Sequence, residues 1–165
     1  NKNSRIEEVV GMIGEAIKDL SDISRSMSSE IILNNGFIKA LEFEVEQLNK
    51  ADLYKITLNI TGEPVFMEAN NELVLFRITQ EALNNIVKHA DASVIDLDLH
   101  YESSECTLKI LDNGKGFAQS DIRRNGLLNM DKRANLLNGS FQILSTPGIG
   151  TTITIKIPID GNNKV

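Results

Sequence analysis

Four polar side chains in the middle of the chain have the types and spacing to hold a metal ion and meet phosphate. They are an acid, a carboxamide, a lysine and a histidine, at Glu81, Asn85, Lys88 and His89. Glu81 and Asn85 are four residues apart, so they share one face of a helix. Magnesium prefers oxygen ligands and keeps several waters, so one protein oxygen often suffices to hold it. Taken alone, the four residues are also explained by a solvated helix face.

A carboxylate followed by glycines, at Asp112, Gly114 and Gly116, comes directly after a segment with strand-like alternation. The glycine spacing matches neither the dinucleotide fingerprint nor the Walker loop. An aspartate at a strand end can accept the exocyclic amine of adenine, while glycine backbone passes close by. Guanine has a carbonyl oxygen at that position and is repelled. A plain Asp-Asn-Gly turn is the alternative interpretation.

Two further glycine segments complete the set. Gly126 and Leu127 begin a predicted helix, whose free backbone N–H groups can bind an anion. Gly148, Gly150 and Thr151 precede the last predicted strand, where the threonine hydroxyl could reach a purine directly or through water. A glycine-rich hairpin explains the second segment equally well.

The elements that must position these clusters are predicted from apolar periodicity. Strands are predicted over residues 54–61, 93–101, 106–111, 140–145 and 151–157, and helices over residues 5–32, 37–49, 70–89 and 127–137. Asn70 or Asn71 is expected to cap the third of these helices. Strands and helices follow each other without strict alternation, which favours an α+β sandwich over a doubly wound sheet. The polar stretch 112–125 is too long for a tight turn and is predicted to be a functional or mobile loop.

The first predicted helix has a heptad pattern with a broad apolar stripe. Its apolar positions are Ile6, Val9, Ile13, Ala16, Leu20, Ile23 and Met27, with a second row at Val10, Ile17 and Ile31. Such a helix is about 42 Å long, whereas a domain of about 110 residues is about 34 Å across. The helix is therefore expected to extend past its own domain and present an apolar face to another chain. The alternative is a helix folded back on the core. Residues 34–36 (Asn-Asn-Gly) are expected to end it.

Composition narrows the class of protein. The chain is 41% hydrophobic, enough for one packed domain, and its net charge of −6 argues against a partner with a phosphate backbone such as nucleic acid. The single cysteine, Cys106, excludes a disulfide scaffold and suits a reducing compartment. Without a long apolar run, we expect a cytoplasmic segment that makes no membrane contact.

Together the clusters resemble the N, G1 and G2 boxes of the Bergerat ATP-binding fold. The segments QEALNNIVKHA, LDNGKGF and GLLNMDKRA are most similar to those of bacterial two-component sensor histidine kinases of the subfamily with a distinct dimerisation domain. The resemblance covers residues 36–158 and implies a two-layer sandwich of helices on a mixed sheet. The heptad helix before it resembles the second helix of that family's dimerisation and phosphotransfer domain.

The resemblance implies a role for each cluster. Asp112, assisted by Thr151, would bind the adenine amine of ATP, and Asn85 would ligate Mg²⁺ on the phosphates. Glu81 and Lys88 would be catalytic, with Lys88 and His89 near the phosphates. The remaining nucleotide-binding residues would be Gly114, Gly116, Gly126, Leu127, Gly148 and Gly150. A lid between Gly116 and Gly126 would close over the nucleotide.

The same resemblance implies a phosphoacceptor histidine on another helix. The chain contains only His89 and His100, and neither has the expected acceptor context, so the acceptor is expected upstream of these residues. We thus predict part of a dimerisation helix (residues 1–33), an ATP-binding catalytic domain (34–160) and a disordered tail (161–165). The implied partners are a second copy, through the N-terminal helix, and a response-regulator receiver domain. Whether a longer parent is membrane-anchored stays open.

Two alternatives are kept. A mechanical ATPase of the gyrase type would need a following transducer domain with a lysine for the γ-phosphate, which the sequence is not expected to include. A non-catalytic dimerisation module with a degenerate nucleotide pocket is disfavoured because Glu81, Asn85, Asp112 and Thr151 are all intact.

Overall fold

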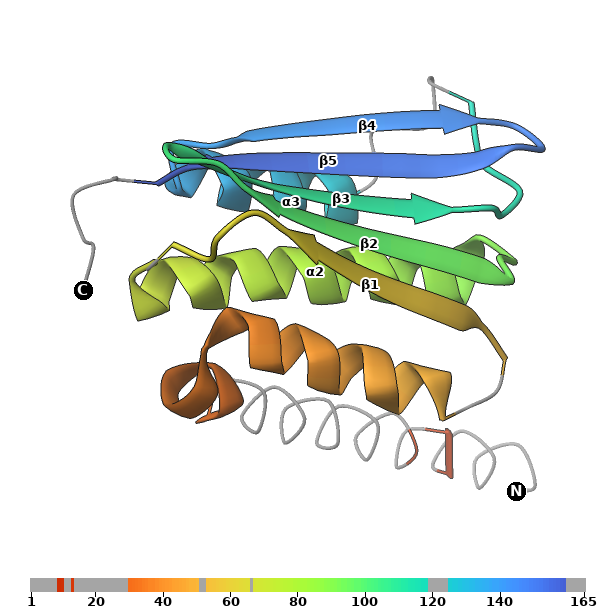
Figure 1. Ribbon diagram of the computed structural model, residues 1–165. Coiled ribbons are helices and arrows are strands. Elements are labelled where there is room, and N and C mark those ends of the chain that lie inside the picture. The colour runs from red at the N-terminus through yellow and green to blue at the C-terminus, as the bar shows by residue number, and fades with distance from the viewer. Residues whose placement is uncertain are drawn as a thin grey trace.

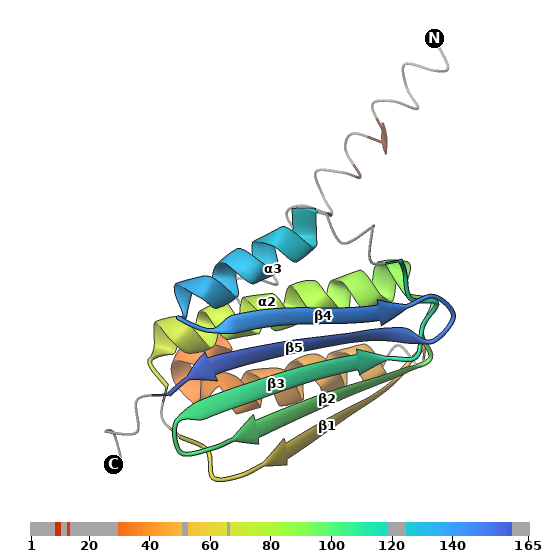
Figure 2. The ribbon, with the colours of Figure 1, turned by 90° about the horizontal axis from the view of Figure 1, so that it is seen from above.

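Five strands form one mixed sheet in the computed structural model of the chain, which describes residues 9, 10, 13, 30–50, 53–65, 67–118 and 125–159. The strands are β1 (Lys55–Thr61), β2 (Val94–Tyr101), β3 (Glu105–Asp112), β4 (Ser140–Thr146) and β5 (Gly150–Pro158). Their order across the sheet is β1-β2-β3-β5-β4, as Figure 2 shows from above. β1 pairs with β2 in parallel and every other pair is antiparallel. The predicted strands are confirmed, and no strand end differs from its predicted position by more than one residue.

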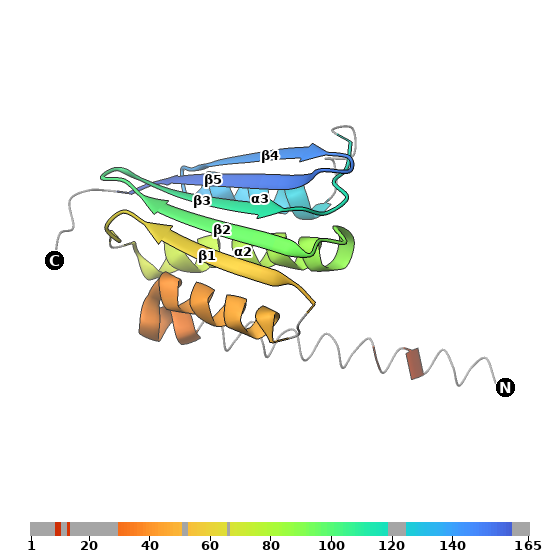
Figure 3. The ribbon, with the colours of Figure 1, turned by 45° about the vertical axis from the view of Figure 1, so that its right-hand side comes forward.

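Helices cover one face of this sheet (Figures 1 and 3). They are α2 (Ala69–His89), α3 (Asn125–Leu136) and a helical stretch over residues 30–49. Inward side chains of the strands, such as Leu97, Leu108 and Ile155, are fully buried beneath them. Lys109 and Lys156, on the opposite face, are exposed. The predicted α+β architecture of two layers is confirmed.

The long helix α2 begins one residue earlier than predicted. Its N-cap is Glu68, which makes no side-chain capping bond. The Glu68 carbonyl instead accepts the N–H groups of Asn71 (2.9 Å) and Glu72 (3.0 Å). The prediction that Asn70 or Asn71 caps α2 was therefore wrong, because the helix begins before both residues and Glu68 occupies the N-cap position.

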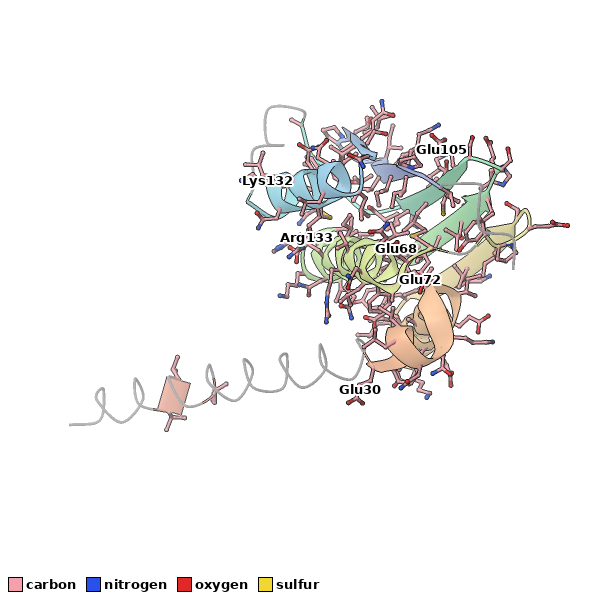
Figure 4. The ribbon with its side chains drawn as sticks, turned by 90° about the vertical axis from the view of Figure 1, so that its left-hand side faces the viewer. Glu30, Glu68, Glu72, Glu105, Lys132 and Arg133 are labelled. Atoms are coloured by element: carbon pink, nitrogen blue, oxygen red, sulfur yellow. The ribbon has the colours of Figure 1, made fainter. Side chains whose placement is uncertain are left out.

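The helical stretch 30–49 changes direction at Gly36. This glycine has φ 81°, a left-handed value that residues with a Cβ rarely adopt. Figure 1 shows the ribbon turning there. The next residue, Phe37, is buried, and its N–H donates to the carboxylate of Glu72 on α2. Figure 4 shows Glu72 between α2 and this stretch. The expected break at 34–36 is thus a sharp turn within one helical stretch.

Several predictions fall outside the described residues. These are most of the heptad helix, residues 119–124 of the lid and the tail 161–165. Of the heptad helix, residues 9, 10, 13 and 30–32 are described. Val9, Val10 and Ile13 are helical and more than half exposed, whereas Ile31 packs partly buried against the core and Ile32 is buried. Among the helices of the described part, none is long and apolar enough to cross a membrane.

Candidate functional site

One face of α2 forms a wall of a cavity of about 270 Å³. Glu81, Asn85 and His89 follow each other at intervals of four residues, and all three line the cavity. Eight residues of helix span about 12 Å, so these side chains form a polar row along the cavity. The opposite wall comes from the sheet and the loop after β3, through Asp112, Lys115 and Thr151. The sequence clusters that seemed separate therefore meet at one site.

Asp112 lies at the last position of β3, where it pairs with Thr151 of β5. Its Oδ1 accepts the N–H of Gly114 at 2.8 Å, and the carboxylate also accepts the N–H and hydroxyl of Thr151. Burial nevertheless raises the pKa of Asp112, since it outweighs these hydrogen bonds. A half-buried carboxylate in this position is an acceptor that can face a bound ligand.

At Gly126, the first turn of α3 lies against Glu81 and Asn85 of the polar row. A Cβ at Gly126 would lie 2.9 Å from Oε1 of Glu81 and 3.4 Å from Nδ2 of Asn85. Gly126 and Leu127 both line the cavity. A helix N-terminus thus lies beside an acidic and a carboxamide side chain. Such a site can bind an anion together with the cation that accompanies it.

Backbone contacts hold the loop after β3 in place. A Cβ at Gly114 would lie 2.3 Å from the Ala90 carbonyl, and one at Gly150, where φ is 130°, would lie 2.0 Å from the Asp112 carbonyl. Asn113 Oδ1 accepts the N–H groups of Ser93 and Val94, at 2.9 and 3.0 Å. These glycines therefore permit close packing of backbone around Asp112.

The predicted glycines differ in their relation to the cavity. Gly116 and Gly126 line it, whereas Gly114, Gly148 and Gly150 are not among the lining residues of the described part. The Gly148 N–H donates to the Lys115 carbonyl at 2.7 Å, which ties the β4–β5 turn to the loop after β3.

The two basic residues at the end of α2 separate. His89 lines the cavity, but Lys88 is exposed and is not among the described lining residues. His89 adjoins Ala90, whose carbonyl accepts the Lys115 N–H at 2.7 Å. This places His89 at the Asp112 end of the polar row, away from Gly126. Consecutive helical residues point in directions about 100° apart, so the two side chains leave α2 in different directions. Whether either lies by the phosphates stays a prediction.

An apolar wall completes the cavity, and its residues were not predicted from the sequence to be part of the site. It includes Ile86 of α2, Ile143 of β4 and Ile153 of β5. Flat aromatic ligands gain from such surroundings, which exclude water from both faces of a ring. Alternation along β4 and β5 marks inward residues, but only the strand pairing shows which of them face the cavity. Lys115, also unassigned, adds a cation to the rim.

The chemistry of the polar row fits a hydrated magnesium ion better than a fully protein-bound metal. No group of three or more His, Cys, Asp or Glu residues that could hold a metal occurs within the described ranges. Asn85 supplies an oxygen on the wall, and phosphate oxygens and waters can complete the six ligands that Mg²⁺ requires.

Comparison with protein families agrees with this geometry. Residues 70–161, more than half of the chain, match the family described as histidine kinase-, DNA gyrase B-, and HSP90-like ATPase. The chain belongs to this ATPase family. The match begins at α2 and includes all the clusters that meet at the cavity. ATP binding by this ATPase domain follows from that membership.

Known sensor kinases are similar over nearly the whole chain. The sensor histidine kinase LiaS of Bacillus subtilis is 31% identical over 94% of the chain, and DegS of Brevibacillus brevis, a signal transduction histidine-protein kinase/phosphatase, is 31% identical over 89%. The chain spans only 43% and 42% of the lengths of these two relatives. The domain thus belongs to the ATPase family named above and is similar to less than half of the length of each of these sensor kinases.

Solved structures of histidine kinases share the fold. The blue-light activated histidine kinase of Erythrobacter litoralis EL346 superposes with a TM-score of 0.67 at 20% identity, covering 90% of this chain and 51% of that one. The histidine kinase AdeS of Acinetobacter baumannii gives 0.62 at 18% identity, covering 89% and 81%.

Proposed function

We propose that this ATPase domain binds Mg-ATP with the purine at Asp112 and the triphosphate beside Asn85 and Gly126, and passes the γ-phosphoryl group to a histidine elsewhere. The observation that supports this proposal most is the shared cavity. Asp112 and Thr151 line one part of it, and Glu81 and Asn85 line another. The polar row from Glu81 to His89 runs about 12 Å along the cavity, a length comparable to an extended nucleotide.

The purine end of the site suits adenine. The Asp112 carboxylate is an acceptor and can receive the exocyclic amine, whereas a guanine carbonyl oxygen would meet it with like charge. Ile86, Ile143 and Ile153 can enclose the ring. We place His89 at this end, where its imidazole can contact the base.

The phosphate end combines an anion site with acidic and amide side chains. The α3 N-terminus at Gly126 offers backbone N–H groups to phosphate oxygens. Asn85 would hold Mg²⁺, which bridges phosphate oxygens and neutralises their charge. Glu81 is the proposed polar or basic catalytic group. Its Oε1 would lie 2.9 Å from a Cβ added at Gly126. Lys88, exposed about one helical turn beyond Asn85, is the second proposed catalytic residue.

The proposal extends to the partners of the whole protein. The acceptor histidine would lie outside these residues, because His89 belongs to the nucleotide cavity and His100 is exposed on the outer face of β2. A second copy would pair through the N-terminal heptad helix, and a response-regulator receiver domain would receive the phosphoryl group. A domain that uses ATP would act on the cytoplasmic side.

Calorimetric titration with Mg-ATP tests the nucleotide assignment. Wild type should prefer ATP to GTP, and Asp112→Asn should bind ATP about tenfold or more weakly, since a charged acceptor is lost. Asp96→Asn, the same change on the outer face of β2, is the matched control and should bind like wild type. Unchanged ATP affinity in Asp112→Asn would contradict the proposed purine site.

A further inference from the structure

A buried serine behind the cavity contacts the residues proposed to read the purine. Ser145 of β4 is 7% exposed and is not among the described residues that line the cavity. Its Oγ lies 2.9 Å from the hydroxyl of Thr151, which is also buried. The same Oγ accepts the N–H of Phe117 at 2.9 Å. Ser145 therefore touches both the β5 side of the site and the loop after β3.

One assignment of the hydroxyl protons links all four residues of this group. The Thr151 hydroxyl donates to the Asp112 carboxylate, which has no proton of its own to give when ionised. The Thr151 oxygen can then only accept from Ser145, whose own oxygen accepts the Phe117 N–H. The weaker contact from Ser145 to the Gly150 carbonyl, at 3.3 Å, is the alternative direction for the serine proton. The chain of bonds runs from Phe117 through Ser145 and Thr151 to Asp112.

We propose that Ser145 is a positioning residue for purine recognition. Its hydroxyl orients the Thr151 hydroxyl toward Asp112 and ties the Phe117 backbone, on the cavity wall, to the same pair. The proposal rests on the proposed function, because it assumes that Asp112 receives the adenine amine. Hydrogen bonds in such a chain strengthen one another, so loss of the first hydroxyl weakens the last bond.

Nothing in the local sequence marks this role. Ser145 lies near the end of an alternating strand and precedes a Pro-Gly turn, a pattern that indicates only an ordinary strand-end serine. The β4–β5 register pairs Ser145 directly with Thr151, and the β3–β5 register pairs Thr151 with Asp112. Asp112, Thr151 and Ser145, from β3, β5 and β4, thus lie in one row across the sheet.

Ser145→Ala removes the hydroxyl and should weaken Mg-ATP binding about three- to tenfold, by calorimetry. It should also reduce the preference for ATP over GTP. Ser145→Thr keeps a hydroxyl and should bind more tightly than Ser145→Ala. Ser140→Ala, at the exposed start of the same strand, is the matched control and should bind like wild type. Thermal unfolding of each variant establishes that it is folded under the titration conditions.

A double-mutant cycle separates positioning from general loss of packing. If Ser145 acts through Thr151 and Asp112, the effect of Ser145→Ala on ATP affinity should largely vanish when Asp112 is already Asn. Equal effects of Ser145→Ala in both backgrounds would overturn the proposal, as would wild-type affinity and selectivity in Ser145→Ala. If wild type itself fails to bind Mg-ATP, the proposed function fails instead.

If Ser145→Ala does not fold, the selectivity for ATP over GTP is measured in Ser145→Thr and Ser145→Cys instead. The threonine variant keeps a strong donor and should retain ATP selectivity, whereas the cysteine variant has only a weak donor and should lose part of it. Equal selectivity for ATP over GTP in these two folded variants would overturn the proposal.

Discussion

Asp112 balances two opposing effects on its charge. Burial raises the pKa of its carboxyl group, while hydrogen bonds from Gly114 and Thr151 oppose the rise. A carboxyl group with a raised pKa in the folded state favours folding less when it is ionised. Its contribution to stability is therefore fully present below the ordinary aspartate pKa of 3.8 and is lost as the pH rises through the higher pKa of the folded state. The charge that would read adenine is thus kept at some cost to stability.

The same raised pKa predicts a pH dependence of nucleotide binding. Protonation of Asp112 removes the charged acceptor, so ATP affinity should fall as the pH is lowered, beginning at a higher pH than for an ordinary aspartate with a pKa of 3.8. Titrations of wild type and Asp112→Asn at a series of pH values measure this. Phosphate protonation affects both proteins alike, so the ratio of their affinities should shrink toward acid pH. A ratio that stays constant with pH would contradict the assignment.

Gly126 provides a test at the phosphate end. Alanine at 126 places a Cβ 2.9 Å from Glu81 Oε1, so the two side chains of the polar row must move. We expect Mg-ATP affinity to drop about tenfold, whereas the unfolding temperature should change little because only flexible side-chain ends are displaced and alanine favours helix. Asn129→Ala, on the exposed side of α3, is the control. Wild-type affinity in Gly126→Ala would place the triphosphate elsewhere.

At the scale of elements, α2 both forms the site and anchors the helical stretch before it. Its first turn supplies Glu72, whose carboxylate accepts the Phe37 N–H just after the turn at Gly36. Its later turns supply Glu81, Asn85 and His89. One helix therefore connects the nucleotide cavity to the segment that leads toward the N-terminal helix.

Glu72→Ala should lower the free energy of unfolding by about 1–2 kcal/mol, because the helical segment from residue 37 loses an acceptor at its N-terminus. Glu72→Gln should cost less, since its amide oxygen can still accept the Phe37 N–H. Chemical denaturation measures both. Glu68→Ala is a matched control, because Glu68 is exposed and makes no capping bond with its side chain. Equal losses in Glu68→Ala and Glu72→Ala would show that the Phe37 contact is not stabilising.

At the scale of the whole molecule, the apolar residues described near the start of the N-terminal helix face solvent, whereas Ile31 and Ile32 at its predicted end pack against the core. Val9, Val10 and Ile13 are 53%, 63% and 54% exposed. This agrees with a helix that pairs with a second copy. Sedimentation should give twice the 18.3 kDa mass of the chain, and Ile13→Asp should shift the population to monomer while leaving Mg-ATP affinity unchanged. A monomer at high concentration in wild type would contradict the proposed pairing.

Apolar periodicity predicted most of the fold, because each strand buries alternate side chains under the helices. It could not give the strand order, which depends on contacts between distant segments. The candidate site could likewise be predicted from the sequence only in part. Asp112 and Asn85 stand out by residue type, whereas Ser145, Ile143 and Ile153 gain their roles only through the pairing of β4 with β5. Lys88 and His89 adjoin in sequence, but of the two only His89 lines the cavity, because consecutive residues of α2 point in different directions.

The most direct test of the account is a crystal structure of the domain with Mg²⁺ and a non-hydrolysable ATP analogue. We predict the adenine amine within hydrogen-bonding distance of the Asp112 carboxylate and the metal bound to the Asn85 oxygen, with phosphates against the first turn of α3. An adenine turned away from Asp112, or a triphosphate bound outside the cavity between α2 and the sheet, would contradict it.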